Sequence, residues 1–216
     1  MKKLEYRLKE LLSEVMSTVI DMTKVSLEMN SPLWEVSRMD GEPVLQLTNN
    51  VPTTNKTGTA AYLDEDHVGK VALIGESRQN YRMQAEMRFL KSYRDNAGWF
   101  GFAIRAQDTL NYEIVWFMPK AEAGVSATYV PVAHGIVPWW TEAYAKQEKG
   151  NPYIPVDTWF RTSIDVIGDE FTVYVEDEPV FTKKLTFYFM EGRPGFFVGT
   201  VTDAAFRRIQ IEDLDD

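Results

Sequence analysis

The sequence has no cysteine, only two histidines and no long run of apolar residues. Without cysteine it can form no disulfide, no thiolate-bound zinc site and no cysteine nucleophile. Without a long apolar run it offers no transmembrane helix. Positive charge is also scarce, with 23 Lys and Arg against 32 Asp and Glu and a net charge of −9. This excess of negative charge argues against partners such as nucleic acids and anionic membrane surfaces.

The composition suits one large domain after a short N-terminal element. The chain has 216 residues, of which 44% are hydrophobic, so it can bury a sizeable core. The opening MKKLEYRLKELLSEVM repeats leucines at helical spacing and predicts an amphipathic helix within residues 1–17. Charged residues interrupt this segment, so it is not a signal peptide. The chain as written is expected to be cytoplasmic, and an export signal lying outside it stays an open alternative.

From residue 18 to residue 216 the pattern changes to short β-rich runs separated by turn residues. This pattern is typical of a single β-sandwich or barrel. Residues 81–90 alternate cleanly between apolar and polar side chains, as in a half-buried antiparallel strand. The expected strands cover 44–47, 71–74, 81–90, 98–105, 112–118, 125–132, 159–166, 171–175, 180–185, 195–201 and 206–211.

Four stretches carry structural motifs. They are PLWEVSRMDGEPVLQL (32–47), the run 81–117 with its Gly-rich strand ending in Arg and a strand opening Tyr-Glu, the run 157–181, and GRPGFFVGTVTDAAFRRIQI (192–211). Together they resemble the concanavalin A-like lectin/glucanase superfamily, and especially its bacterial glycoside-hydrolase-like domains of unknown function. The resemblance implies an all-β jelly-roll sandwich of two antiparallel sheets, with a carbohydrate groove on the concave sheet. It indicates the fold better than the activity.

One motif of the catalytic members is missing. Laminarinase-type enzymes of the superfamily carry Glu-x-Asp-x-x-Glu, or a close variant, on one strand. This chain lacks it, and its nearest acidic cluster, residues 176–178, falls at a predicted turn. We interpret that cluster as a solvated hairpin tip, which argues against ordinary retaining glucanase chemistry.

The strand GWFGFAIR and the strand that begins Tyr112-Glu113 hold the first candidate residues. Alternation puts the small residues Gly101 and Ala103 on the face of Arg105, which leaves room for a ligand or for an overlying loop. If Glu113 shares that face, it forms with Arg105 either a pair that binds sugar hydroxyls or a plain cross-strand ion pair. Related hydrolase-like families also show an Arg strand followed by Tyr-Glu, and this resemblance supports Arg105 and Glu113 as candidates. Tyr112 is a further candidate for substrate binding.

The polar face of residues 81–90 gives a second group, Gln84, Glu86 and Arg88. They line the same surface if their face is the concave one, and are otherwise simply solvated. Glycoside hydrolysis needs two carboxyl groups roughly 5–10 Å apart. Glu86 and Glu113 are candidates for this catalytic pair if their strands are neighbours and their faces agree.

The stretch AHGIVPWWTEAYAKQEKG (133–150) interrupts the β pattern. Pro138 suits the start of a short helix over 139–147, so the domain is expected to carry a loop–helix insertion. On that helix Trp140 and Tyr144 share one face and Trp139 lies on another. These aromatic rings could stack on a sugar, and His134 could act as general acid or base. The alternative is a lid anchored by its tryptophans, with a structural histidine.

No metal site or cofactor is expected. The acids beside His67 are contiguous, so they cannot converge on one ion, and no zinc-protease, P-loop, dinucleotide or EF-hand spacing occurs. The resemblance leaves a structural calcium ion open, because calcium ligands in this fold class are partly backbone oxygens.

The sequence therefore predicts a carbohydrate-binding protein, with glycoside hydrolysis as one possible activity. One alternative is a non-catalytic lectin-like or oligomerisation module, in which the N-terminal helix packs against a second chain. Another is a polysaccharide lyase, since His134, Tyr112 and Arg105 are the residue types for a base and a charge neutraliser.

Overall fold

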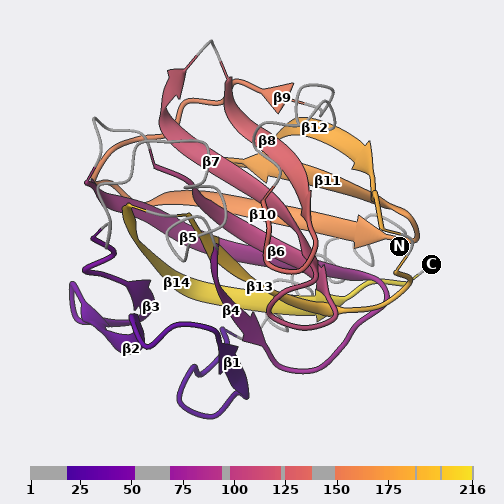
Figure 1. The fold of residues 1–216 in the computed structure, drawn as a ribbon, viewed down its shortest axis with the longest axis horizontal. Coiled ribbons are helices and arrows are strands. Elements are labelled where there is room, and N and C mark those ends of the chain that lie inside the picture. The colour runs from indigo at the N-terminus through magenta and orange to yellow at the C-terminus, as the bar shows by residue number, and fades with distance from the viewer. Residues whose placement is uncertain are drawn as a thin grey trace, which may run out of the picture.

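The computed structural model describes residues 19–51, 69–93, 98–122, 125–137, 149–187, 189–199 and 201–215. Within these residues the chain forms fourteen strands in two antiparallel sheets that pack as a jelly-roll-like sandwich (Figure 1). The described part contains no helix, and hence none long and apolar enough to cross a membrane. The helices expected within residues 1–17 and over 139–147 lie outside the described residues.

Each sheet has seven strands. Sheet A runs β1 (Leu27–Met29), β4 (Lys70–Ile74), β13 (Arg193–Val198), β6 (Phe100–Ala106), β7 (Tyr112–Glu122), β8 (Val125–Val132) and β9 (Lys149–Gly150). Sheet B runs β12 (Glu178–Lys184), β11 (Glu170–Val175), β10 (Phe160–Ile167), β5 (Tyr81–Ser92), β14 (Thr202–Asp213), β3 (Glu42–Leu47) and β2 (Trp34–Met39).

The eleven strands expected from the sequence all overlap observed strands, and β1, β2 and β9 are additional. The predicted pairing of 98–105 with 112–118 is confirmed, because β6 and β7 are neighbours. The three consecutive strands β10, β11 and β12 also pair in order, as expected for residues 159–185. Short turns explain this success, since they force neighbouring strands to pair.

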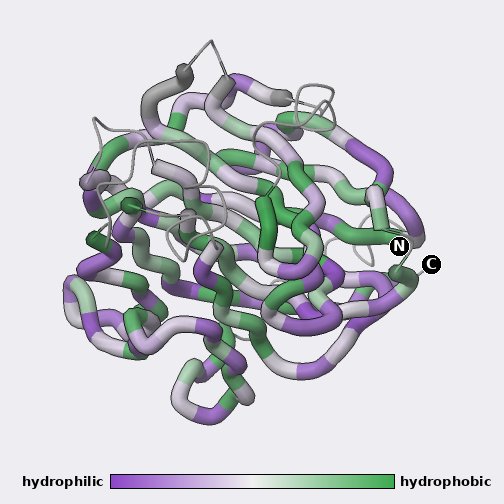
Figure 2. The backbone as a smooth tube through the Cα atoms, in the orientation of Figure 1, coloured by the Kyte–Doolittle hydropathy of each residue, from purple (hydrophilic) through white to green (hydrophobic). Residues whose placement is uncertain are grey.

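The core lies between the sheets and is built from alternate residues of each strand. Figure 2 shows hydrophobic and hydrophilic residues interspersed along the chain. The ring of Phe196 on sheet A stacks on that of Phe206 on sheet B, with centroids 4.1 Å apart. Phe100 and Phe160 meet edge to face across the same space, 6.0 Å apart. Burying each such ring contributes roughly 1.5–3 kcal/mol to stability.

The outer faces of the two sheets differ in character. Sheet A carries a second buried apolar cluster on its outer side, so its central strands are covered on both faces and have almost no polar residues. In sheet B the outer face is polar, as the alternating burial pattern of β5 shows. The apolar cluster of sheet A comprises Val71, Leu73, Ala103, Ala106, Tyr112, Ile114, Trp116, Met118, Val130, Val132, Val137 and Phe197.

The small residues of β6 do not leave open space above sheet A. Gly101 and Ala103 are both buried. A Cβ atom added at Gly101 would lie 2.1 Å from the carbonyl oxygen of Val115 on β7. Glycine is therefore required here by the close approach of a neighbouring strand, not by a ligand.

We predict that Gly101→Ala lowers the free energy of unfolding by about 1–3 kcal/mol, the usual cost of overpacking. The clash is with backbone, so β7 has to move to relieve it. Urea denaturation followed by tryptophan fluorescence measures the loss. An unchanged denaturation midpoint would show that the two strands are not packed as described.

Candidate functional site

Glu113 is fully buried on the inner face of sheet A. Its carboxylate accepts hydrogen bonds from the backbone N–H groups of Thr186 (3.0 Å) and Phe187 (2.7 Å), and from the hydroxyl of Tyr129. Thr186 and Phe187 follow β12 on the way back to sheet A. Glu113 therefore holds this connection against the core. Burial raises the pKa of its carboxyl group to about 7, although the two N–H donors act in the opposite direction.

Arg105 lies at a β-bulge. The sequence predicted strict alternation along β6, and a bulge breaks that alternation. Ile104 and Arg105 together oppose the single residue Pro194 of β13, and Arg105 has a positive φ of 50°. The bulge turns its side chain away from the outer face of sheet A. Its guanidinium donates to the carbonyl oxygens of Arg78 (3.2 Å), Gly168 (2.9 Å) and Met190, so it joins three loops at one end of the sandwich.

The structure thus buries the first group of candidates, Arg105, Glu113 and Tyr112, inside the fold. Within the described residues no hydrogen bond or ion pair joins Arg105 to Glu113. Tyr112 is buried in the outer apolar cluster of sheet A, where desolvation raises its pKa and its hydroxyl finds no partner in the described part. All three side chains are fully buried, and none of them lines an open surface.

The pKa of Glu113 makes stability depend on pH. Glutamate has an ordinary pKa of 4.5, so between pH 4.5 and about pH 7 the unfolded chain releases a proton that the folded chain keeps. The stabilising contribution is full below pH 4.5 and is lost as the pH rises through about 7, by at most about 1.4 kcal/mol per pH unit.

We predict that Glu113→Gln, which keeps the shape of the side chain, abolishes this contribution. Urea denaturation of both proteins between about pH 4 and about pH 8 measures the difference in unfolding free energy. That difference is expected to change only within the stated window. A difference that is constant with pH would mean that Glu113 ionises normally in the folded protein.

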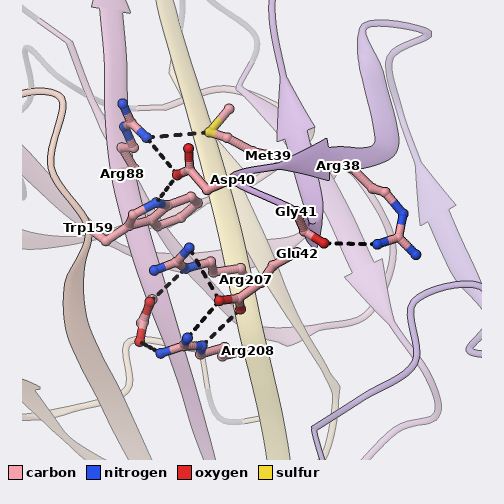
Figure 3. A network of polar contacts seen from close by, with 10 residues as sticks. Arg38, Met39, Asp40, Gly41, Glu42, Arg88, Trp159, Arg207 and Arg208 are labelled. Carbon is pink, nitrogen blue, oxygen red and sulfur yellow. Dashed lines mark hydrogen bonds and ion pairs between the residues drawn. The ribbon is translucent and has the colours of Figure 1, made fainter.

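The outer face of sheet B holds a cluster of polar contacts, most of which Figure 3 shows, and we name it the sheet B network. Its residues come from the β2–β3 hairpin, from β5, from β14 and from the segment that leads into β10. They are Asp40, Glu42, Glu86, Arg88, Asp157, Trp159, Arg207 and Arg208.

A second bulge builds the arginine pair of this network. Successive residues of a regular strand point to opposite faces. In β14, however, Arg208 and Ile209 together oppose the single residue Ala85 of β5, and Arg208 has a φ of 51°. The bulge lets Arg207 and Arg208 reach the same carboxylate. Bulges recur beside functional sites because they redirect side chains in this way.

Two carboxylates bind this arginine pair. Glu86 accepts from Arg207 Nε and from Arg208 Nη1, both at 2.7 Å. Glu42 accepts two hydrogen bonds from Arg208, at 2.9 and 2.6 Å. These bonds from Arg208 hold the pKa of Glu42 below its ordinary value, so Glu42 stays ionised at neutral pH.

Trp159 lies at the centre of the network and is half-buried. The guanidinium carbon of Arg207 lies 4.2 Å from the centre of the indole, and that of Arg88 lies 5.8 Å from it, both within the range of cation–π contacts. The indole N–H donates to Asp40 at 3.2 Å, and Arg88 donates to Asp40 at 3.3 Å and to Asp157 at 2.8 Å. The ring is thus held in place by three charged side chains, those of Arg207, Arg88 and Asp40.

The β2–β3 hairpin supplies the acidic side of this arrangement. Asp40 and Gly41 both have positive φ, 53° and 82°, as the central residues of a tight hairpin turn require. This turn places Asp40 above Trp159 and leaves its carboxylate at the surface. Figure 3 shows Asp40 and Arg88 on one side of the indole and Arg207 on the other.

Only part of the predicted site is brought together. Glu86 and Arg88 belong to the sheet B network, and Gln84 lies half-buried on the same face of β5. Glu86 and Glu113 are not neighbours, because β5 and β7 belong to different sheets and Glu113 points inward. His134 is exposed in the turn after β8, and its backbone N–H donates to the side-chain oxygen of Asn111 at 3.2 Å. The remaining candidates, Trp139, Trp140 and Tyr144, lie outside the described residues.

Sequence reasoning missed most of the network. Two local signals were present in the sequence. Alternation around Phe160 places Trp159 on the outer face, and Asp40-Gly41 predicts a turn. The approach of Asp40 to Trp159 joins residues 119 positions apart, and no local pattern encodes it. In the described part of the chain, no three His, Cys, Asp or Glu side chains are placed to hold a metal ion.

Comparisons with known proteins identify the fold. No family model and no curated protein matches the chain. Among solved structures, the carbohydrate-binding module CBM66 from Bacillus subtilis is 14% identical, with a TM-score of 0.62 over 87% of this chain and 95% of that one. A Bacillus subtilis protein of unknown function with a galectin-like fold is 10% identical (TM-score 0.59, 92% and 93% covered). The alginate lyase AlyC3 is 12% identical (0.51, 86% and 80%). This chain therefore shares the β-sandwich fold of these proteins, the fold that its resemblance to concanavalin A-like lectins and glucanases implied.

Proposed function

We propose that this protein binds carbohydrate on the outer face of sheet B, at the sheet B network. The observation that carries the proposal is a half-buried indole held among guanidinium and carboxylate groups on an open sheet face. The carbohydrate-binding module with the same fold supports the ligand class, and the network supplies the chemistry.

A sugar ring has two kinds of surface, and the network can meet both. Its C–H faces are apolar and pack against aromatic rings. Its hydroxyls donate to carboxylates and accept from guanidinium groups. The part of the Trp159 indole that Arg88 and Arg207 do not cover can pack against the C–H face of a sugar ring. Asp40 and Asp157 can accept from its hydroxyls, because their side chains are 57% and 62% exposed. Gln84 and Glu86 extend the polar face along β5.

The arrangement favours binding over hydrolysis. A glycosidase needs one carboxyl group that stays protonated as general acid and a second that acts as base or nucleophile. Glu42 is held ionised by Arg208, and Glu86 bonds to both arginines of β14. Both carboxylates are thus engaged as acceptors of arginine N–H groups. Stacking by Trp139, Trp140 and Tyr144 and proton transfer by His134 remain separate predictions.

We predict that Trp159→Ala and Arg88→Gln each weaken saccharide binding about tenfold or more, a loss of about 1.4 kcal/mol. Isothermal titration against a panel of mono- and oligosaccharides measures the affinity. The same mixtures, assayed for new reducing ends and for unsaturated products, test for hydrolysis and for lysis, which the proposal expects to be absent.

Arg82→Gln is the matched control. Arg82 lies on the same face of β5 as Arg88, pairs with Asp165 at 2.6 Å and lies 5.9 Å from the Tyr174 ring, but does not touch the network. Its substitution is expected to leave affinity unchanged. Equal losses in Arg82→Gln and Arg88→Gln, or binding that survives in folded Trp159→Ala, would place the ligand elsewhere.

A further inference from the structure

We infer that the sheet B network selects uncharged saccharides and rejects acidic ones such as uronates. This inference rests on the proposed function and narrows its ligand class. It comes from the state of the arginines, which are the groups that would recognise an anionic sugar. An arginine that binds a ligand carboxylate needs donors that are not already satisfied by the protein.

Each arginine of the network already has carboxylate partners. Arg88 donates to Asp157 (3.0 and 2.8 Å) and to Asp40 (3.3 Å). Arg208 donates to Glu42 and Glu86. Arg207 donates to Glu86 at 2.7 Å, lies 3.7 Å from Glu42, and its side chain is only 12% exposed. Each guanidinium of the network is therefore already charge-paired with at least one carboxylate of the protein.

The local charge has the wrong sign for an acidic ligand. Three guanidinium groups, on Arg88, Arg207 and Arg208, face four carboxylates, on Asp40, Glu42, Glu86 and Asp157, so the network has a net charge of 3 − 4 = −1. The most exposed of these groups, Asp40 and Asp157, are both acidic. An incoming carboxylate would therefore meet these two acidic groups along with Arg208, whose side chain is 50% exposed and already paired with Glu42 and Glu86.

The surrounding face of sheet B does not compensate for this charge. Arg161, the cross-strand partner of Glu86 on β10, pairs with Asp177. Arg82 forms two bonds of 2.6 Å with Asp165. The whole chain carries a charge of −9, so its long-range field also repels anions. Hydroxyl groups, by contrast, can donate to the free lone pairs of Asp40 and Asp157 without adding charge.

The test compares matched sugars that differ in one group. Gluco- and galacto-oligosaccharides are titrated beside the same oligosaccharides oxidised at C6 to uronates, so that only CH₂OH and COO⁻ differ. We expect the neutral sugar to bind about tenfold tighter or more. The gap is expected to widen as salt is lowered from about 0.5 M to about 0.02 M, because screening weakens, while the affinity for the neutral sugar stays constant.

Charge variants locate the source of the selectivity. Asp157→Asn removes one negative charge and weakens the pairing of Arg88, so it is expected to reduce the ratio of neutral to acidic affinity severalfold. Asp165→Asn removes a carboxylate from the same face outside the network and is expected to leave the ratio unchanged. Equal changes in the two variants would contradict a local origin.

The outcomes separate this inference from the proposed function. Binding of uronates as tight as that of neutral sugars, or tighter, would overturn the inference and leave carbohydrate binding standing. Binding of neither class would overturn the proposed function itself. Tighter binding of neutral sugars, lost in Trp159→Ala and reduced in ratio by Asp157→Asn, supports both.

Discussion

The two-residue period of the β-strand is the constraint on which the rest of this structure depends. It gives each strand one face toward the core and one face away from it. In sheet B the outward face is polar, whereas in sheet A the outward face is a second buried apolar cluster. The polar side chains that a sheet face exposes to a ligand therefore lie mainly on sheet B. Two buried polar side chains of sheet A, Arg105 and Glu113, instead hydrogen-bond to backbone groups of the loops inside the sandwich.

Two interruptions of this period place the arginines that matter most. At Arg105 and at Arg208 one strand inserts an extra residue, and both residues have a φ near 50° (50° and 51°). The first bulge turns a guanidinium inward, where it joins three loops. The second brings two consecutive arginines to one carboxylate. The same backbone device thus serves cohesion at the end of sheet A and the proposed binding surface on sheet B.

Strand positions could be predicted from the sequence, because alternation and turn residues are local signals. The inward direction of Glu113 was also predictable, because alternation puts it on the same face of its strand as the core residues Val115 and Phe117. The bulges were not, since no residue type marks them in AIRAQ or FRRIQ, and strict alternation put Arg105 on the wrong side. Glu86 and Arg88 were found as polar residues of β5, whereas their partners Asp40 and Trp159 are distant in sequence and meet only in the folded sheet.

The central claim is that the sugar binds at Trp159, and the indole N–H signals of the six tryptophans test it most directly. In ¹⁵N-labelled protein, each signal is assigned by single Trp→Phe substitution and followed during titration with neutral oligosaccharide. We predict a saturable shift of the Trp159 signal, while those of the buried Trp34 and Trp116 stay in place. A shift confined to Trp139 and Trp140, with Trp159 unmoved, would contradict the account and place the ligand on the segment after β8.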